Sequence, residues 1–252
     1  MSLEAHREPS SPLLQAQKLC YRYPRRGVVL DQVDFDLHIG ERVALTGANG
    51  TGKTTFLHLL VGLKKAKAGQ VIAFGKPCVS EADFVCVRSR IGFLFQDPDD
   101  QLFCPTVLED VAFGPLNQGK SRGEALGIAQ QTLQDLGMAD FADAVTHQLS
   151  GGEKRMITLA TVLAMQPDIL LLDEPSNALD QQARERLLTT LKSLPQAMLI
   201  ISHDHDFLAQ LATRTLVLDA AQLVTRTPVL DSVEIEKKAT GLSEPNNIEA
   251  VL

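Results

Sequence analysis

Residues 47–54 read Gly47-Ala48-Asn49-Gly50-Thr51-Gly52-Lys53-Thr54 and decide the fold. A strand-like stretch at 43–45 precedes them and a helix-like stretch at 55–61 follows, which is the context that a phosphate-binding loop (P-loop) requires. The glycines let backbone N–H groups converge on phosphate oxygens, and the helix N-terminus adds favourable partial charge. A glycine-rich turn without a ligand is the alternative reading of this motif.

The loop predicts ATP and Mg²⁺ as cofactors. The side chain of Lys53 should reach the β- and γ-phosphates, and the hydroxyl of Thr54 should bind Mg²⁺. The nucleotide contacts predicted in this segment are Gly47, Asn49, Gly50, Gly52, Lys53, Thr54 and Thr55.

A second candidate element is the apolar stretch 169–172, which runs directly into Asp173 and Glu174. Two carboxylates then lie at the end of a buried strand, where an α/β sheet exposes its chemistry. Asp173 suits the Mg²⁺ shell, and Glu174 is placed to polarise an attacking water, which favours hydrolysis over transfer to an organic acceptor. A capped strand end with solvated acids is the alternative.

The order of elements predicts an α/β fold. Residues 30–37, 42–45 and 70–74 form a strand-rich N-terminal part, whereas residues 107–113 and 122–136 carry helix-spaced apolar side chains. After them, helices at 153–165 and 181–194 alternate with strands at 169–172 and 197–201, which indicates a parallel sheet covered on both faces. The predicted organisation is a tail at 1–12, one domain at 13–227 with a helical insertion at about 97–149, and a second tail at 228–252.

The bulk composition excludes some classes of protein. The net charge of −7 and the pI near 5.4 argue against non-specific electrostatic binding of nucleic acid. No stretch approaches the roughly 18 apolar residues of a membrane-spanning helix, and the N-terminus has no apolar run typical of a secretion signal. We therefore expect a chain that meets a membrane only peripherally, at its cytoplasmic face.

The segment Leu149-Ser150-Gly151-Gly152-Glu153 leads into a predicted helix and distinguishes this chain from other P-loop proteins. A serine with two glycines at a helix N-terminus is a second phosphate-binding site, although a serine-capped helix is the alternative. The segment resembles the signature of ATP-binding cassette (ABC) ATPases. That resemblance implies that Ser150, Gly151 and Gly152 of one subunit face the nucleotide held on the P-loop of another.

Further positions resemble the family in order over roughly residues 13–220. Tyr23 lies where an aromatic ring stacks on adenine, with Tyr21 as the competing candidate. Gln96 matches the glutamine that touches Mg²⁺ and links the site to the transporter. His203 matches the histidine that contacts the γ-phosphate, although the run 203–206, His-Asp-His-Asp, also has the composition of a metal site.

Asp180 resembles the aspartate of a loop that crosses the dimer interface, with a helix cap as the alternative. Ala178 departs from the family pattern, because a glycine is common at this position. The departure leaves the backbone path of this loop open.

The stretch 96–117 resembles the energy-coupling-factor importers, especially their cobalt and nickel members. In that family this region docks helices of a transmembrane partner, and Leu102 and Phe103 offer an apolar contact surface here, with core packing as the alternative. The resemblance implies an ATP-hydrolysing subunit that energises a nickel or cobalt importer. Its expected partners are a second ATPase subunit, identical or paralogous, a transmembrane coupling protein and a substrate-binding membrane component.

Two other functions remain open from the sequence. Vitamin importers, those for biotin among them, share nearly all of these features. A soluble ABC ATPase in DNA maintenance, translation or iron–sulfur assembly is the rival from another class, but this chain lacks the long coiled-coil insertion or the second cassette of two of those groups. A P-loop kinase would leave the segment 149–153 unexplained.

Overall fold

The computed structural model describes residues 11–226. A four-stranded antiparallel sheet forms its N-terminal part, in the order β2-β1-β4-β5. The strands are β1 (Leu14–Tyr23), β2 (Gly27–Leu37), β4 (Ala68–Ala73) and β5 (Lys76–Cys78). The predicted tail at 228–252, and most of the one at 1–12, lie outside the described residues.

A six-stranded sheet carries the rest of the fold, in the order β10-β9-β3-β8-β7-β6. All neighbours pair in parallel except β10, which runs antiparallel to β9. The strands are β3 (Arg42–Thr46), β6 (Ile91–Leu94), β7 (Ile169–Asp173), β8 (Ala197–Ile201), β9 (Arg214–Asp219) and β10 (Gln222–Arg226).

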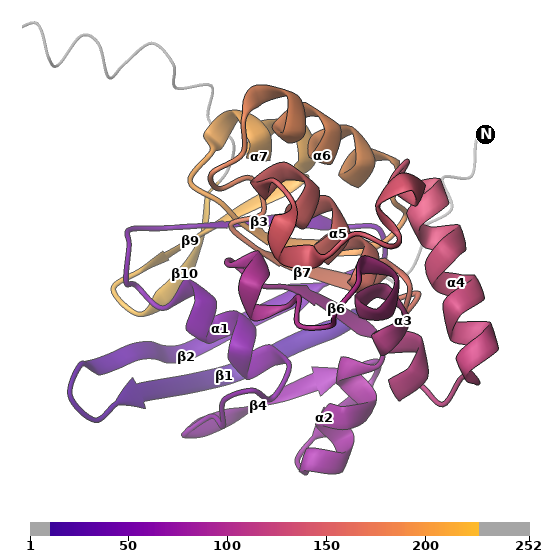
Figure 1. Cartoon of the computed structure of the whole chain (residues 1–252). Helices are drawn as coiled ribbons and strands as arrows, with labels where there is room; N and C mark the ends of the chain where they lie inside the picture. Colours follow the sequence, from indigo (N-terminus) through magenta and orange to yellow (C-terminus); the bar gives the residue numbers. More distant parts are fainter. Residues whose placement is uncertain (1–10, 227–252) are drawn as a thin grey trace, which may run out of the picture.

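Helices cover both faces of this second sheet (Figure 1). Every residue of β7 and β8 is buried, as expected of parallel strands between helical layers. Alternate side chains point to opposite faces, so Ile169 and Leu171 enter a core shared with α1 and the antiparallel sheet, while Leu170 and Leu172 enter a core shared with the later helices. The helices are α1 (Lys53–Leu60), α2 (Glu81–Arg88), α3 (Val107–Asn117), α4 (Arg122–Asp135), α5 (Gly151–Leu163), α6 (Gln181–Ser193) and α7 (His205–Leu211).

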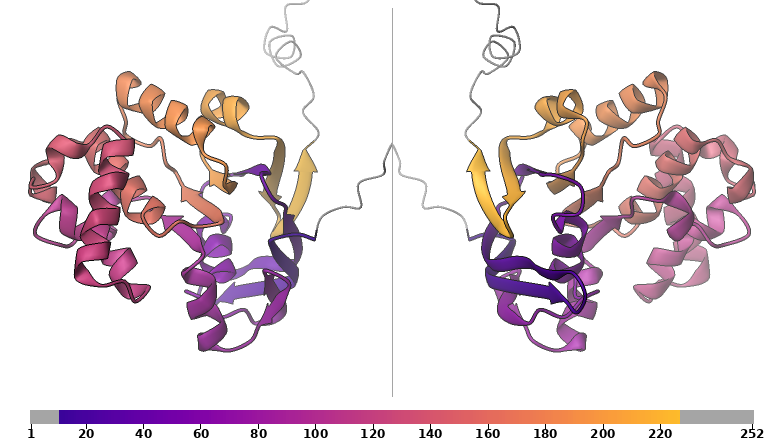
Figure 2. Two further views of the ribbon diagram at one scale, coloured as in Figure 1. Left: turned by 90° about the vertical axis from the view of Figure 1, so that its right-hand side faces the viewer. Right: turned by 90° about the vertical axis from the view of Figure 1, so that its left-hand side faces the viewer.

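The segment between β6 and α5 contains α3, α4 and three short 3₁₀ helices, η1 (Pro98–Asp100), η2 (Ala139–Phe141) and η3 (Thr146–Gln148). Figure 2 shows α3 and α4 at one side of the molecule and the antiparallel sheet at the other. Within residues 11–226, none of the helices has both the length and the apolar character needed to span a bilayer.

Several predicted boundaries shift by one to three residues. The helix predicted at 55–61 is α1 and begins at Lys53, and the helix predicted at 153–165 is α5, which begins at Gly151 and ends at Leu163. Both helices begin earlier because their first residues belong to the glycine-rich loops, where apolar periodicity gives no signal.

The topology collects four loops at one edge of the six-stranded sheet. The P-loop follows β3, His203 follows β8, Glu174 follows β7 and Gln96 follows β6. Because β3, β8, β7 and β6 are adjacent and parallel, their carboxyl ends meet at the same edge. That edge is where α/β sheets bind ligands.

Candidate functional site

A cavity of ≈ 510 Å³ lies at this edge of the sheet. It joins four regions that the sequence predicted separately, namely the P-loop, Gln96, the pair Asp173 and Glu174, and His203. The P-loop supplies Asn49, Gly50, Gly52, Lys53, Thr54 and Thr55. Arg26, Asn177 and Ile201 also line the cavity and were not predicted.

The P-loop has a backbone that only glycine tolerates at two positions. Gly47 has φ +138°, and a Cβ placed there would lie 2.5 Å from the carbonyl oxygen of Leu218. Gly52 has φ +115° and is the N-cap of α1, where no side chain caps the helix. The first N–H groups of α1 are therefore left for a ligand, and an anion is the ligand that a helix N-terminus favours.

Lys53 is almost fully buried and folds back over the loop. Its Nζ donates hydrogen bonds to the carbonyl oxygens of Gly47 at 2.8 Å and Ala48 at 3.1 Å. Burial lowers the pKa of Lys53, while the nearby Glu174 and Asp173 act in the opposite direction. The cation is thus held in place beside the cavity before any anion arrives.

Asp173 supplies the feature expected of a metal ligand. Its side chain is 2% exposed, and its Oδ1 atom is buried and has no hydrogen-bond partner among residues 11–226. Burial raises its pKa, and a side-chain hydrogen bond with Thr54 acts against that rise. Mg²⁺ prefers oxygen ligands, and this site offers the buried carboxylate oxygen of Asp173, the hydroxyl of Thr54 and the amide oxygen of Gln96. The residues present therefore fit this ion.

Glu174 is held in an unusual backbone conformation. Its φ is +48°, and its N–H donates to the carbonyl oxygen of Ile201 at 2.9 Å. Its carboxylate accepts a hydrogen bond from the backbone N–H of His203 at 3.2 Å, and Nε2 of the His203 ring lies 3.4 Å from Oε1. Such strain in a non-glycine residue gathers at functional sites, because the surrounding structure must enforce it.

Gln96 lies at the border of two cavities. Its side chain is exposed and lines the first cavity and also a second one of ≈ 360 Å³. Gly151, Arg155 and Ala178 line the second cavity too. The predicted glutamine therefore lies between the P-loop and the N-terminus of α5.

The signature serine caps α5 within its own chain. Oγ of Ser150 accepts a hydrogen bond from the N–H of Glu153 at 3.4 Å, and both the N–H and the hydroxyl of Ser150 donate to Oε2 of Glu153 at 2.7 Å. A Cβ at Gly152 would press on Ala183, whereas Gly151 borders open space. None of these three predicted residues lines the first cavity, so a contact with nucleotide there needs a second chain and stays a prediction.

Asp180 likewise acts as a cap, accepting a hydrogen bond from the N–H of Ala183 at 2.8 Å. It lines neither cavity, and its predicted role at a dimer interface stays a prediction. Ala178 has φ +58°, so the backbone keeps the left-handed turn that a glycine would take more easily. The open question about the path of this loop is thereby answered.

Tyr23 contacts the helix that follows the P-loop. Its hydroxyl lies 2.9 Å from the Thr55 hydroxyl, and its ring packs edge-on against Tyr21 at 5.0 Å. Nζ of Lys64 lies 5.5 Å from the centre of the Tyr23 ring. Tyr23 does not line the cavity, so adenine stacking stays a prediction.

The run 203–206 is organised by Asp204. This carboxylate bonds Arg184 through two nitrogens, at 2.5 and 2.8 Å, and caps α7 by accepting from the N–H of Phe207. The hydrogen bonds from Arg184 lower the pKa of Asp204. Across residues 11–226, His, Cys, Asp and Glu side chains form no group of three or more that fits a metal ion.

Leu102 and Phe103 do not share one environment. Leu102 is 8% exposed and belongs to the core under α3 and α5, so its expected place on a contact surface is wrong. Its aliphatic side chain fills the space between helices, which is the core packing that the sequence left open. Phe103 is 64% exposed and packs edge-on against the half-exposed Phe113 at 4.8 Å.

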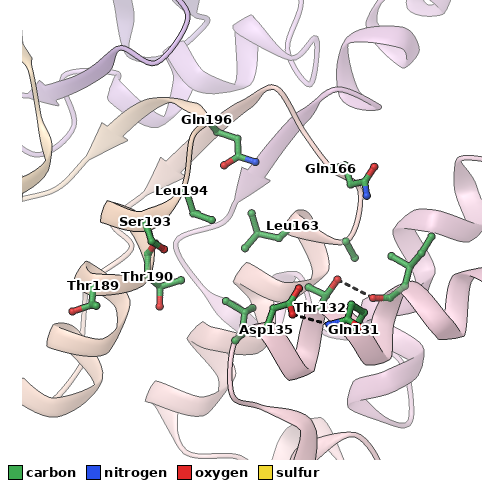
Figure 3. A pocket seen from close by; sticks show the side chains of 13 residues that line it. Gln131, Thr132, Asp135, Leu163, Gln166, Thr189, Thr190, Ser193, Leu194 and Gln196 are labelled. Atoms are coloured by element: carbon green, nitrogen blue, oxygen red, sulfur yellow. Dashed lines mark hydrogen bonds between the residues drawn. The ribbon is translucent and has the colours of Figure 1, made fainter.

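Another cavity, of ≈ 590 Å³, lies between α4 and α6 and contains none of the predicted site residues (Figure 3). Asp135 is the one carboxylate of its lining, and it accepts a hydrogen bond from Gln131 at 2.7 Å. The hydroxyls of Thr132, Thr190 and Ser193 donate to carbonyls of their own helices. The chemistry is therefore concentrated at the P-loop cavity.

Comparison with known sequences gives a consistent result. A family model described as ABC transporter matches residues 30–177. A protein of Brucella suis, provisionally named an ABC transporter ATP-binding protein, is 52% identical over 207 residues, which cover 82% of this chain and 86% of the relative. An uncharacterized ABC transporter ATP-binding protein of Haemophilus influenzae is 46% identical over 214 residues, covering 85% and 98%.

Two solved structures share the architecture. CbiO1 of Clostridium perfringens, described as part of the ABC transporter complex CbiONQ, has a TM-score of 0.75 and 30% identity, covering 85% of this chain and 87% of that one. A dimeric bacterial ABC transporter cassette has a TM-score of 0.74 and 26% identity, covering 83% and 96%. The predicted α/β fold with a P-loop core and an antiparallel sheet is confirmed.

Proposed function

This chain belongs to the ABC transporter family, and we propose that it is the ATPase subunit that energises an importer of the energy-coupling-factor kind. Its ATP-binding domain is that of an ATPase, and such ATPases work as dimers with membrane components. The proposed cargo is nickel or cobalt, and the proposed place is the cytoplasmic face of the cell membrane. The second ATPase subunit is either a copy of this chain or a paralogue.

One observation carries the proposal of hydrolysis in this cavity. The buried Asp173 offers an unpartnered oxygen within a cavity that also contains Lys53 and Glu174. A cation, a metal-binding carboxylate and a second carboxylate are the groups that an attack of water on a nucleotide phosphate requires. No grouping of this kind lines the larger cavity between α4 and α6.

Each residue has a distinct proposed role. Lys53 exchanges its two loop carbonyls for phosphate oxygens when ATP enters. Thr54, Asp173 and Gln96 would hold Mg²⁺, which would neutralise charge on the phosphates as a Lewis acid. Glu174 accepts a hydrogen bond from the attacking water and polarises it, and the backbone N–H of His203 keeps the carboxylate oriented.

The importer class rests on two supports. The stretch 96–117 resembles energy-coupling-factor ATPases, and a structural neighbour is described as part of the complex CbiONQ. The exposed Phe103 and Phe113 form an apolar pair beside the Gln96 loop, which suits contact with a transmembrane partner. A nickel or cobalt cargo follows from the resemblance.

The hydrolytic role is tested with Glu174→Gln in the full chain. The variant should bind a fluorescent ATP analogue as the unmodified protein does, while turnover falls about 10²-fold or more because the water loses its carboxylate partner. ATP should then persist and hold a dimer, which light scattering detects in ATP and not in ADP. Turnover at the unmodified rate would remove Glu174 from this role, and a variant that binds ATP but stays monomeric would contradict the shared site.

The importer role is tested by affinity purification from detergent-solubilised membranes. Phe103→Ser should reduce co-purification with integral membrane proteins and abolish nickel or cobalt uptake, and basal ATPase activity should survive. Phe84→Ser, a half-buried phenylalanine on α2, serves as the matched control for loss of an aromatic ring. Absence of an integral partner in the unmodified sample would favour a soluble ABC ATPase instead.

A further inference from the structure

The loop that carries Gln96 is joined to α5 by a buried arginine. Nη1 of Arg155 donates to the carbonyl oxygen of Phe95 at 2.7 Å, and Nη2 donates to the carbonyl oxygen of Gln96 at 2.6 Å. Two consecutive peptide groups are therefore fixed by one planar guanidinium. These two peptide planes set the direction in which the Gln96 side chain leaves the backbone.

Arg155 occupies a position where an apolar residue would be expected. It is 2% exposed and lies in a stretch of α5 that is buried on all sides and otherwise contains apolar residues such as Met156, Ile157 and Leu159. Burial lowers its pKa to about 10, so it remains charged at neutral pH. Burying a guanidinium is costly unless its donors are used, and its Nε has no partner within residues 11–226. Core packing therefore gives no reason for an arginine here, whereas the two carbonyls do.

Other residues of α5 hold the same loop further along. Nζ of Lys154 pairs with Asp99 at 2.6 Å, and Nε2 of Gln101 donates to the carbonyl of Thr158 and to the hydroxyl of Thr161. The segment 95–101 is thus attached to α5 by hydrogen bonds and an ion pair along its length. Arg155 is the contact that reaches the peptide group of Gln96 itself.

We propose that Arg155 is the positioning residue for Gln96, holding its backbone so that the side chain meets the nucleotide cavity. The inference rests on the proposed function, because Gln96 acts only if ATP and Mg²⁺ bind there. Arginine suits the task and lysine does not, since a planar fork bonds two neighbouring carbonyls and a single ammonium does not reproduce that geometry.

The arrangement also joins two sites of a dimer. Ser150 begins the same helix five residues before Arg155, and its proposed contact is the nucleotide on the other subunit. Arg155 thereby joins the helix whose N-terminus would meet the other subunit's nucleotide to the glutamine of its own subunit's site.

The first test is a double-mutant cycle on turnover of the full-length protein. Gln96→Ala and Arg155→Met should each lower kcat by about 10- to 10²-fold, the cost of a misplaced group at the reacting centre, and leave the Kd for a fluorescent ATP analogue within about twofold. Combining them should lower kcat no further than Gln96→Ala alone, because Arg155 acts through Gln96. Arg155→Lys keeps the charge and should lose nearly as much activity, which guards against an unfolded Arg155→Met protein.

Arg42→Met is the matched control. Nη2 of Arg42 also donates to two carbonyls, those of Lys192 and Leu194, but at the opposite end of β3 from the P-loop. This variant should lower the melting temperature and leave kcat unchanged. Full activity in Arg155→Lys, or kcat losses that multiply in the Gln96 and Arg155 double variant, would overturn the proposal.

The second test is amide hydrogen exchange of the nucleotide-free protein. Arg155→Met should speed exchange in the segment 95–101 by about tenfold or more and leave β2 unchanged. Unchanged exchange in this segment would overturn the proposal. If Gln96→Ala leaves kcat intact, the proposed role of Gln96 fails, and the exchange result alone decides whether Arg155 holds the loop.

Discussion

Two helices of this chain begin at glycine-rich loops, and they differ in how far the chain satisfies their N-termini by itself. The N-cap of α1 is Gly52, with no side-chain cap. The N-cap of α5 is Ser150, in a complete capping box with Glu153. The first N–H groups of α1 therefore depend on a ligand, whereas in α5 the capping box satisfies the N–H groups of Ser150 and Glu153 and brings a carboxylate to the helix N-terminus.

The charges beside the two helices differ in the same sense. At α1, the ammonium group of Lys53 lies over the P-loop and supplies a positive charge. At α5, hydrogen bonds from Ser150 lower the pKa of Glu153, so its carboxylate is negatively charged at neutral pH. A nucleotide phosphate is attracted to α1 and meets a negative charge at α5. The comparison predicts that ATP first binds at the P-loop and that contact with α5 is the weaker, later step.

The largest expected effect is at the uncapped helix. Gly47→Ala places a Cβ against the Leu218 carbonyl and forces an alanine to φ +138°, which costs about 3 kcal/mol and lowers ATP affinity about 10²-fold, as titration should show. Gly75→Ala is the control, because Gly75 also has a positive φ but no neighbour within 4 Å of a Cβ. Equal losses in both variants would mean that strain alone, and not the closed loop, explains the effect.

An intermediate effect is expected at the capped helix. Glu153→Gln retains the capping box but removes the charge, so the ATP-dependent dimer of the Glu174→Gln protein should tighten about two- to fivefold, the worth of one charge at a helix N-terminus. Light scattering against protein concentration measures it. Glu124→Gln removes the same charge from the Ser121 capping box of α4 and should change nothing. A dimer weakened by Glu153→Gln would reverse the comparison.

The smallest effect concerns Ala178, which together with Gly151 lines the cavity of ≈ 360 Å³ next to the P-loop cavity. Ala178→Gly relieves a left-handed alanine and should stabilise the protein by about 0.5–1 kcal/mol, because the relief exceeds the added chain entropy of glycine. Ala221→Gly, at φ +65° in the β9–β10 turn, should give a similar gain in thermal unfolding. A gain at Ala221 with a loss at Ala178 would show that the strain at Ala178 is balanced by contacts of the alanine methyl.

The parallel part of the fold followed from the sequence because its strands are buried on both faces. The runs 169–172 and 197–201 are continuous apolar stretches between helical patterns, which is an unambiguous signal. The sequence pattern predicted the strand β1 and the helix α2 only weakly, for two different reasons. Lys18 has φ +50° and shifts the register of β1, and α2 buries only Val87 and depends on the Ser80 and Asp83 capping box.

The site could be predicted where function depends on a motif within one loop. The P-loop, Asp173 and Glu174 belong to that group, and the structure brings them into one cavity with Gln96 and His203. Arg26 and Arg155 could not be predicted, since tertiary packing brings Arg26 against Gly50 and brings Arg155 to the carbonyl oxygens of Phe95 and Gln96. A basic residue just after Tyr23 and an arginine within an apolar helix face were the only signals available for them.

The place of β3 in the sheet fixes the order in which the molecule can be built. The strand ends at Thr46, yet both of its neighbours, β8 and β9, come from residues 197–219, about 150 residues later. At ~5–20 residues/s the ribosome needs roughly 8–30 s to make that stretch. The antiparallel sheet, whose strands all lie within residues 14–78, can pair during this interval. The P-loop strand waits beside it, with both of its hydrogen-bonding edges unpaired, until the end of the chain emerges, and unpaired edges make a nascent chain prone to aggregation.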